Sequence, residues 1–236
     1  MATIARTECG DLPDGGRQEA SDNMAENELP DSKQARVDWV IRAPDNSEMR
    51  RRYDVWADRY DGDVGSVEDY AAPGHLAEMA HRHLDPNSLV IDAGAGTGLV
   101  AAALKPKGFR RMIALDYSER MLAVARGKNL YTDLAQCDLS RQTSFAADFA
   151  DAVVTCGTTT QVPCESLNEY VRLVRPSGKI IFAAVTGTWQ ACGYAAVFDR
   201  LEKSNRIRLI ETGAPFQMMP TTEPDFICEI MVMETL

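Results

Sequence analysis

The stretch VIDAGAGTGLV, at 90–100, constrains the fold of this chain more than any other. It begins with a short apolar run of the kind that forms a strand buried on both faces. Gly94, Gly96 and Gly98 then follow within five positions and lead into a predicted helix. Because glycine has no Cβ, the chain can turn sharply there and a ligand can lie against the backbone. A tight turn without a ligand is the alternative.

Strands and helices alternate through the rest of the chain. Apolar runs predict further strands at 111–116, 132–137, 150–156 and 179–185, with helices between them. Alternation of this kind predicts a parallel sheet with right-handed crossovers. Two last strands with no helix between them predict an antiparallel hairpin at the sheet edge. We therefore expect an α/β fold: a Rossmann-like, doubly wound, seven-stranded sheet with an antiparallel C-terminal hairpin and extra N-terminal helices.

The start of the chain differs in composition from the rest. Residues 1–34 hold eight acidic and three basic residues and few large apolar ones. This composition predicts a disordered acidic leader at 1–34, followed by one folded domain at 35–236. The whole chain has a formal net charge of -10, and an acidic surface repels phosphate backbones, so a nucleic acid is not the expected partner.

The sequence also predicts where the protein resides. It has no apolar run long enough to cross a membrane, and its start lacks the pattern of a secretory signal, so we expect no membrane association. Six cysteines are scattered without metal-ligand spacing. This predicts reduced thiols, no metal site and a cytoplasmic location, with the nucleus as an alternative. Oligomeric state is not predicted by any motif, and a monomer is favoured.

Two aspartates near the glycines narrow the choice of ligand. Asp92 lies two residues before Gly94, where it would repel the pyrophosphate of a dinucleotide, and Leu99 replaces the third glycine of the dinucleotide motif. A nicotinamide-dependent oxidoreductase is therefore disfavoured. Asp116 ends the next strand, 18 residues after Gly98, where a carboxylate accepts hydrogen bonds from ribose hydroxyls. A nucleoside with a cationic tail would place its positive charge near Asp92 and its ribose hydroxyls on Asp116. The two acids together therefore predict S-adenosylmethionine.

At this point the sequence resembles the class I S-adenosylmethionine-dependent methyltransferases, over about residues 45–236. The resemblance rests on the stretches VIDAGAGTG, ALDYSERML, AQCDL, ADAVVTCG and LVRPSGKIIF. It implies S-adenosylmethionine as the cofactor and methyl transfer as the activity. It also implies a set of cofactor-binding residues: Tyr60, Asp92, Ala93, Gly94, Ala95, Gly96, Asp116, Tyr117, Asp138, Leu139, Cys156 and Gly157.

The roles of these residues are those that the resemblance implies. The glycine-rich turn, with the backbone around Ala93 and Ala95, lines the methionine part and the ribose. Asp92 anchors the amino-acid end, directly or through water, and Asp116 holds the ribose diol. Tyr60 belongs to a helix that folds over the cofactor.

The adenine and the methionine end have further implied contacts. Tyr117 packs against the adenine face, Asp138 accepts from the adenine amino group, and Leu139 offers its backbone N–H to the ring. Cys156 and Gly157 contact the methionine end through their backbone. Asp138 has an equally good interpretation as the cap of the next helix, and the Cys156 side chain as a small core residue.

The methyl acceptor is less constrained than the cofactor. Methyl transfer from a sulfonium mainly needs positioning and exclusion of water, so no catalytic residue is predicted. The sequence after the fourth strand reads TCGTTTQ rather than the [ND]-P-P-[FYW] of enzymes that methylate nucleic-acid amines. We expect a small molecule or a protein side chain as acceptor. The candidates to line its pocket are Tyr53, Tyr70, Thr158, Gln161 and Trp189.

Two further hypotheses concern activity and motion. A non-catalytic partner protein that binds the cofactor and supports another methyltransferase is the alternative function. The predicted helix at 46–60 carries Tyr53, Trp56 and Tyr60 on one face, at spacings of three and four. We expect this helix to be a lid that orders over the cofactor, with a hinge at Gly62.

Overall fold

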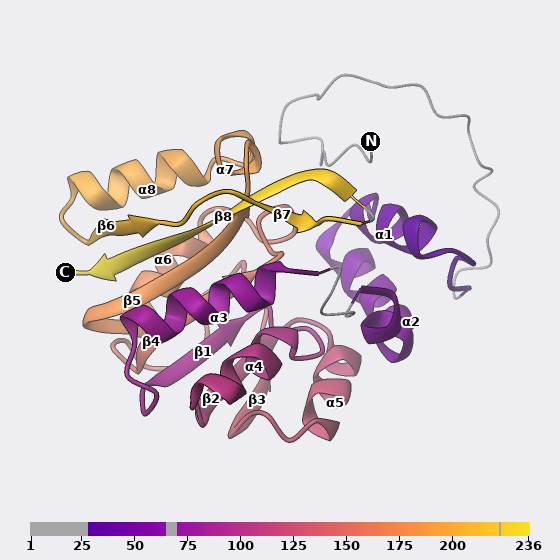
Figure 1. Ribbon diagram of the computed structural model, residues 1–236, viewed down its shortest axis with the longest axis horizontal. Coiled ribbons are helices and arrows are strands. Elements are labelled where there is room, and N and C mark those ends of the chain that lie inside the picture. Colours follow the sequence, from indigo (N-terminus) through magenta and orange to yellow (C-terminus); the bar gives the residue numbers. More distant parts are fainter. Residues whose placement is uncertain (1–27, 65–69, 222) are drawn as a thin grey trace.

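The computed structural model describes residues 28–64, 70–221 and 223–236, so residues 1–27 of the predicted leader lie outside the described residues. Helices cover both faces of one central sheet (Figure 1). The helices are α1 (Lys33–Ile41), α2 (Asn46–Val64), α3 (Ala72–His83), α4 (Leu99–Leu104) with the 3₁₀ turn η1 (Lys105–Lys107), α5 (Glu119–Gly127), α6 (Ser166–Leu173), α7 (Thr188–Ala191) and α8 (Tyr194–Lys203). The strands are β1 (Leu89–Ala93), β2 (Arg111–Asp116), β3 (Asp133–Gln136), β4 (Ala150–Cys156), β5 (Val174–Val185), β6 (Ile207–Thr212), β7 (Phe216–Met219) and β8 (Glu223–Thr235).

The order of the strands confirms the predicted doubly wound fold. They follow the order β3-β2-β1-β4-β5-β8-β6, with β1 to β5 parallel and β8 antiparallel to both β5 and β6. From β1 the chain winds outward to β3, and from β4 it winds outward in the opposite direction. The carboxyl ends of β1 and β4 therefore border the crevice where sheets of this kind bind ligands.

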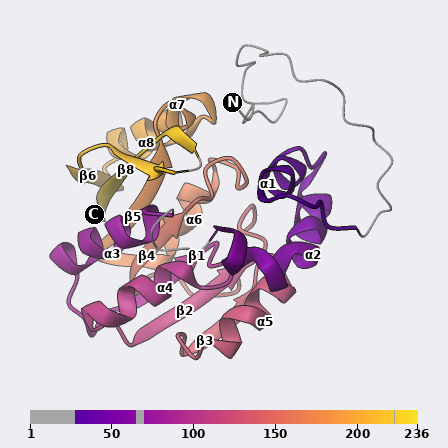
Figure 2. The ribbon, with the colours of Figure 1, turned by 45° about the vertical axis from the view of Figure 1, so that its right-hand side comes forward.

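Side chains alternate between the two faces of the sheet and build two cores. Val90, Met112 and Ile181 face α3 and α4, whereas Ile91, Val153 and Phe182 face α6 and α8. Figure 2 shows α3, α4 and α5 along one side of the sheet and α6 and α8 on the other. Because the inner strands are buried on both faces, their sequences are continuously apolar, as predicted.

The first two helices lie beyond the carboxyl ends of the parallel strands (Figure 1). The Ser32 side chain caps α1 by accepting from the Ala35 N–H, and the Asp45 side chain caps α2 by accepting from the Glu48 N–H. Trp56 is 2% exposed and donates from Nε1 to Asp63, 2.6 Å away. The same carboxylate pairs with Arg36 of α1 at 2.7 Å, which joins the two helices.

Three local features differ from the sequence prediction. The stretch WQACGYAAVFDRLEKS, at 189–204, has the pattern of one continuous helix, but Gly193 has a φ of +79° and separates α7 from α8. The short strand β7 was not expected, and it pairs with β8. Helix α2 continues through Gly62 to Val64, so the expected hinge residue lies inside the helix.

Candidate functional site

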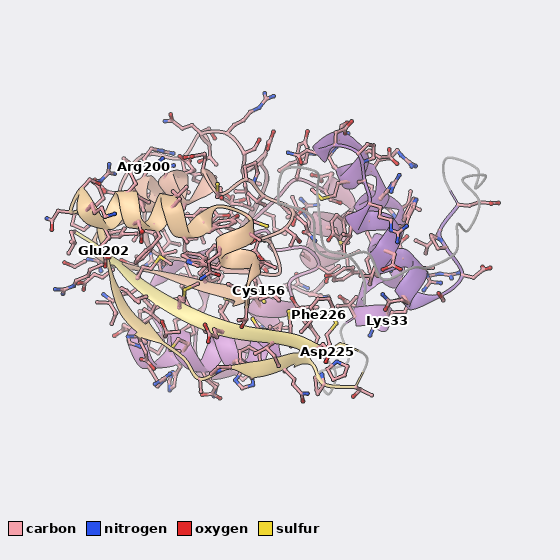
Figure 3. The ribbon with its side chains drawn as sticks, turned by 90° about the horizontal axis from the view of Figure 1, so that it is seen from above. Lys33, Cys156, Arg200, Glu202, Asp225 and Phe226 are labelled. Atoms are coloured by element: carbon pink, nitrogen blue, oxygen red, sulfur yellow. The ribbon has the colours of Figure 1, made fainter. Side chains whose placement is uncertain are left out.

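One pocket opens at the carboxyl ends of β1, β2 and β4, beneath α1 and α2. It has a volume of about 230 Å³ and is lined by residues from the glycine-rich turn, from the segments after β2, β3 and β4, and from both ends of the described chain. Three of its lining residues are labelled in Figure 3, where Cys156, Phe226 and Lys33 follow one another from the sheet toward α1. The pocket occupies the crevice that the topology predicts.

The glycine-rich turn brings bare backbone to this pocket. Gly94 has a φ of +78°, and a Cβ there would lie 2.4 Å from Cγ2 of Thr158, which follows β4. Gly96 has a φ of +54°, but a Cβ there would meet no atom within 4 Å. Gly94 is thus needed for close packing of two loops, whereas the backbone at Gly96 faces open space that a ligand can fill.

Asp92 is a buried carboxylate at the base of the turn. It is 1% exposed, and its Oδ2 accepts from the Tyr131 hydroxyl at 2.6 Å. Its Oδ1 is buried without a hydrogen-bond partner among the described residues. Burial, together with the nearby charge of Asp116, raises the pKa of Asp92 to about 7, while the hydrogen bond from Tyr131 opposes the rise.

Asp116 is held at the end of β2 by backbone donors. Its Oδ2 accepts from the Gly96 N–H at 2.7 Å and its Oδ1 from the Ser118 N–H at 2.8 Å. Burial raises the pKa of Asp116, and these backbone hydrogen bonds oppose the rise. The contact with Gly96 fixes the position of this carboxylate relative to the glycine-rich turn.

The end of β4 carries a thiol and a phenol in contact. The Tyr70 hydroxyl lies 3.4 Å from the Cys156 Sγ, and a Cβ on Gly157 would approach that hydroxyl to 2.9 Å. Burial raises the pKa of Cys156 to about 12 and the pKa values of Tyr60 and Tyr70 well above their usual range. All three groups are therefore neutral near physiological pH.

Helix α2 is docked over the pocket by polar contacts on two sides. Gln161, after β4, donates to the Tyr53 hydroxyl at 2.6 Å. On the other side, Asp54 of α2 accepts from the Ser118 hydroxyl at 2.5 Å. Since Ser118 also donates to Asp116, the docking of α2 is linked to the residue predicted to hold the ribose.

Most of the predicted cofactor residues lie together around this pocket. Those that line it are Tyr60, Gly94, Gly96, Asp116, Tyr117, Asp138, Leu139, Cys156 and Gly157. Ala93 and Ala95 are buried in the core, and the Ala95 N–H donates to the Leu115 carbonyl, so it is already paired. Asp138 accepts from both the Ser140 N–H and hydroxyl, but a turn and not a helix follows it, so the alternative of a helix cap is wrong.

The predicted acceptor residues also converge, with one exception. Tyr53, Tyr70, Thr158 and Gln161 line the pocket, but Trp189 packs against Phe182, Tyr194 and Phe198 in the core. The sequence analysis missed other lining residues: Lys33, Val37 and Val40 from α1, Arg50 from α2, and Met218, Met219 and Phe226 from β7 and β8. The unpredicted strand β7 supplies part of this set, and no sequence motif indicates that strand.

The residues present fit S-adenosylmethionine. The unpartnered Oδ1 of Asp92 suits a cationic amino group, and the open space beside Gly96 suits a ligand that lies on the backbone. Asp116 presents its carboxylate at the strand end where a ribose would lie.

No cluster of His, Cys, Asp and Glu suited to a metal ion occurs among the described residues. In the same part of the chain, every helix is too short or too polar to span a bilayer.

Comparison with known proteins identifies the family. The family model for a methyltransferase domain matches residues 91–182. Human methyltransferase-like protein 27 is 33% identical over 193 residues, which cover 77% of this chain and 78% of that protein.

Solved structures share the fold at lower identity. The methyltransferase in a complex with the Trm112 activator of Haloferax volcanii has a TM-score of 0.59 at 19% identity, over 79% of this chain and 96% of that one. A TehB-like methyltransferase from Corynebacterium glutamicum has a TM-score of 0.58 at 16% identity, over 78% of this chain and 98% of that one. The cyclase SpnF has a TM-score of 0.63 at 14% identity, over 82% of this chain and 97% of that one. Because a cyclase shares the fold, the fold alone does not determine the reaction. On the glycine-rich site and the curated relative together, the chain belongs to the class I S-adenosylmethionine-dependent methyltransferases.

Proposed function

We propose that this pocket binds S-adenosylmethionine and that the chain transfers its methyl group to a small molecule or a protein side chain. The observation that carries the proposal is the Asp116 carboxylate, which the Gly96 N–H holds at the pocket beside open backbone. The buried carboxylate of Asp92 lies close enough to Asp116 for the two charges to interact. Asp116 would hold the ribose, and the unpartnered oxygen of Asp92 would face the amino-acid end. The cofactor supplies an activated methyl group on a sulfonium.

The chain's own residues position the acceptor and exclude water. Tyr53, Trp56 and Tyr60 form an aromatic layer on α2 with ring centroids 4.9 to 6.3 Å apart. This layer and the loop after β4 cover the end of β4, where Cys156 and Tyr70 lie. A covered, largely apolar site holds the two reactants in line and keeps water from competing as acceptor.

Titration with S-adenosylhomocysteine tests the binding site. Asp116→Ala removes the carboxylate assigned to the ribose and should weaken binding by about 1.5–3 kcal/mol, the usual value of charged hydrogen bonds. That loss corresponds to roughly 10- to 150-fold in affinity. Asp133→Ala, at an exposed position on neighbouring β3, is the control and should leave affinity unchanged. Equal affinities in folded Asp116→Ala and wild-type protein would contradict the assignment.

Transfer of labelled methyl groups separates an enzyme from a binding partner. The protein is incubated with labelled S-adenosylmethionine and cell extract, which is then divided into protein, RNA and small-molecule fractions. Label in the protein or small-molecule fraction, abolished by Gly96→Arg, supports the proposed enzyme. Binding of the cofactor without transfer into any fraction would instead favour the non-catalytic partner.

Finer assignments are part of the same proposal. The stretches YDVWADRYDGDV and GTGLVAAALKPKGF resemble the methyltransferase-like protein of the Williams–Beuren syndrome chromosome region. We also propose a cytoplasmic monomer, and the six scattered cysteines without metal-ligand spacing support the reducing compartment. Sedimentation and cell fractionation test the two assignments separately.

A further inference from the structure

Helix α2 packs along α5, and the two helices lie side by side in both Figure 1 and Figure 2. Three aspartates of α2 follow this contact at spacings of four and three, so they share one face of the helix. We define the aspartate stripe as Asp54, Asp58 and Asp61. Each of the three contacts either α5, the residue that caps α5, or the glycine-rich turn.

Asp61 holds the glycine-rich turn. Thr97 is 1% exposed, and its hydroxyl donates to Asp61 Oδ1 at 2.5 Å. Asp61 also pairs with Lys128, just after α5. Thr97 directly follows Gly96, whose N–H donates to Asp116 Oδ2 at 2.7 Å. Asp61 therefore restrains the backbone next to one donor of the carboxylate assigned to the ribose.

Asp54 restrains the other donor of that carboxylate. Its Oδ1 accepts from the Ser118 hydroxyl at 2.5 Å and from the Arg120 N–H at 3.3 Å. The Ser118 N–H donates to the second oxygen of Asp116, Oδ1, at 2.8 Å. Each oxygen of the Asp116 carboxylate thus accepts from an N–H whose own or next side chain is tied to α2.

Asp58 lies between these two aspartates but has a different kind of partner. It pairs with the Arg120 side chain at 2.8 Å, and the two side chains are 70% and 57% exposed. This contact ends at an exposed guanidinium instead of a donor of Asp116. Exposed ion pairs contribute little to stability, so Asp58 provides a matched control on the same face of the same helix.

We infer that Asp54 and Asp61 are positioning residues that hold the two donors orienting the Asp116 carboxylate toward the cofactor's ribose, and this rests on the proposed function. Neither aspartate is among the described residues that line the pocket, so both act through Thr97 and Ser118. A carboxylate that accepts from a diol needs one fixed orientation, which surrounding hydrogen bonds supply. By linkage, ribose bound to Asp116 favours the arrangement in which α2 is docked.

Four variants separate these contacts. Thr97→Val removes the hydroxyl with little change in shape and leaves Asp61 paired with Lys128. Thr97→Ser keeps the hydroxyl and is the conservative rescue. Asp54→Ala removes the acceptor for the Ser118 hydroxyl, and Asp58→Ala is the control.

Each variant is titrated with S-adenosylhomocysteine and with its 2′,3′-dideoxy analogue, which lacks the ribose hydroxyls. Thr97→Val and Asp54→Ala should each weaken binding of S-adenosylhomocysteine about tenfold, as expected for the loss of one hydrogen bond. They should leave the affinity for the analogue nearly unchanged, because the analogue makes no hydrogen bond to Asp116. Thr97→Ser and Asp58→Ala should bind both ligands as the wild-type chain does.

Hydrogen exchange measures the same linkage in the opposite direction. At saturating concentrations, S-adenosylhomocysteine should protect residues 48–62 more than the dideoxy analogue does. Thr97→Val should remove this difference, because it releases α2 from the turn beside Asp116.

The outcomes separate the two proposals. Equal losses of affinity for both ligands, no loss for either, or an equally large loss in Asp58→Ala would each overturn the positioning role. Thr97→Val and Asp54→Ala break separate contacts, so one of them decides the question if the other does not fold. Binding of S-adenosylhomocysteine to the wild-type chain would still support the proposed function in those cases, whereas the absence of that binding would overturn the proposed function itself.

Discussion

Replacing Asp92 with asparagine should make the protein more stable and a poorer cofactor binder. The Asp92 carboxylate is 1% exposed, and among the described residues only the Tyr131 hydroxyl donates to it. Ionising a group in such a place is costly, and burial accordingly raises its pKa to about 7 from an ordinary value of 3.8. Asparagine has nearly the same shape but carries no charge.

The size of the effect follows from the pKa. A rise of about three units corresponds to about 4 kcal/mol between the two protonation states. Because the pKa is raised in the folded state, the free energy of unfolding is undiminished below about pH 4 and decreases as the pH rises toward 7. The advantage of Asp92→Asn should therefore grow by about 2 kcal/mol between pH 5.5 and pH 8.5.

Urea unfolding of both proteins at these two pH values measures the difference directly. Other titrating groups are shared by the two proteins and cancel when their free energies of unfolding are subtracted. Asp199→Asn, at an exposed position of α8, is the control and should show no growth with pH. If the advantage of Asp92→Asn does not change with pH, the carboxylate is not carrying a buried charge and the argument is wrong. Affinity for S-adenosylhomocysteine should fall by roughly 10- to 100-fold in the same variant.

Two further predictions concern the glycine-rich turn and the lid. Gly94→Ala should cost at least about 2 kcal/mol more stability than Gly96→Ala, because only the former drives a methyl group into Thr158; equal losses in thermal unfolding would show that the two loops separate easily. Hydrogen exchange at 48–62 should slow when S-adenosylhomocysteine is added, and by more than in the strand at 179–185. Equal protection of that helix with and without ligand would show that its aromatic face is packed permanently on the core and that the helix is not a lid.

The parallel half of the sheet could be predicted because its signals are local. Continuous apolar runs mark strands buried on both faces, and the glycines and Asp116 mark the ends of the first two strands. The position of Asp116 was therefore predictable to the residue. The hydrogen bond that fixes it to the Gly96 N–H joins residues 20 apart, and the alternation of elements already brings those two turns together.

The contacts that escaped prediction depend on long-range packing. Tyr131 reaches Asp92 across 39 residues, and nothing near either residue indicates the pairing. Trp189 was assigned to the pocket, but α7 is a single turn that Gly193 separates from α8, so helical spacing could not show which way the ring points. It packs against Phe182, with ring centroids 5.3 Å apart.

Most of the apolar side chains that line the pocket come from the two ends of the described chain, whereas the predicted cofactor contacts other than Tyr60 cluster in its middle. The terminal segments supply Val37, Val40, Met49, Met218 and Phe226, and the methyltransferase family model matches only 91–182. These five side chains are not among the predicted cofactor contacts, so substitutions at them can accumulate without touching the donor side of the reaction. A library confined to them should yield enzymes with new acceptors and an unchanged cofactor, so that selectivity evolves as a separate trait.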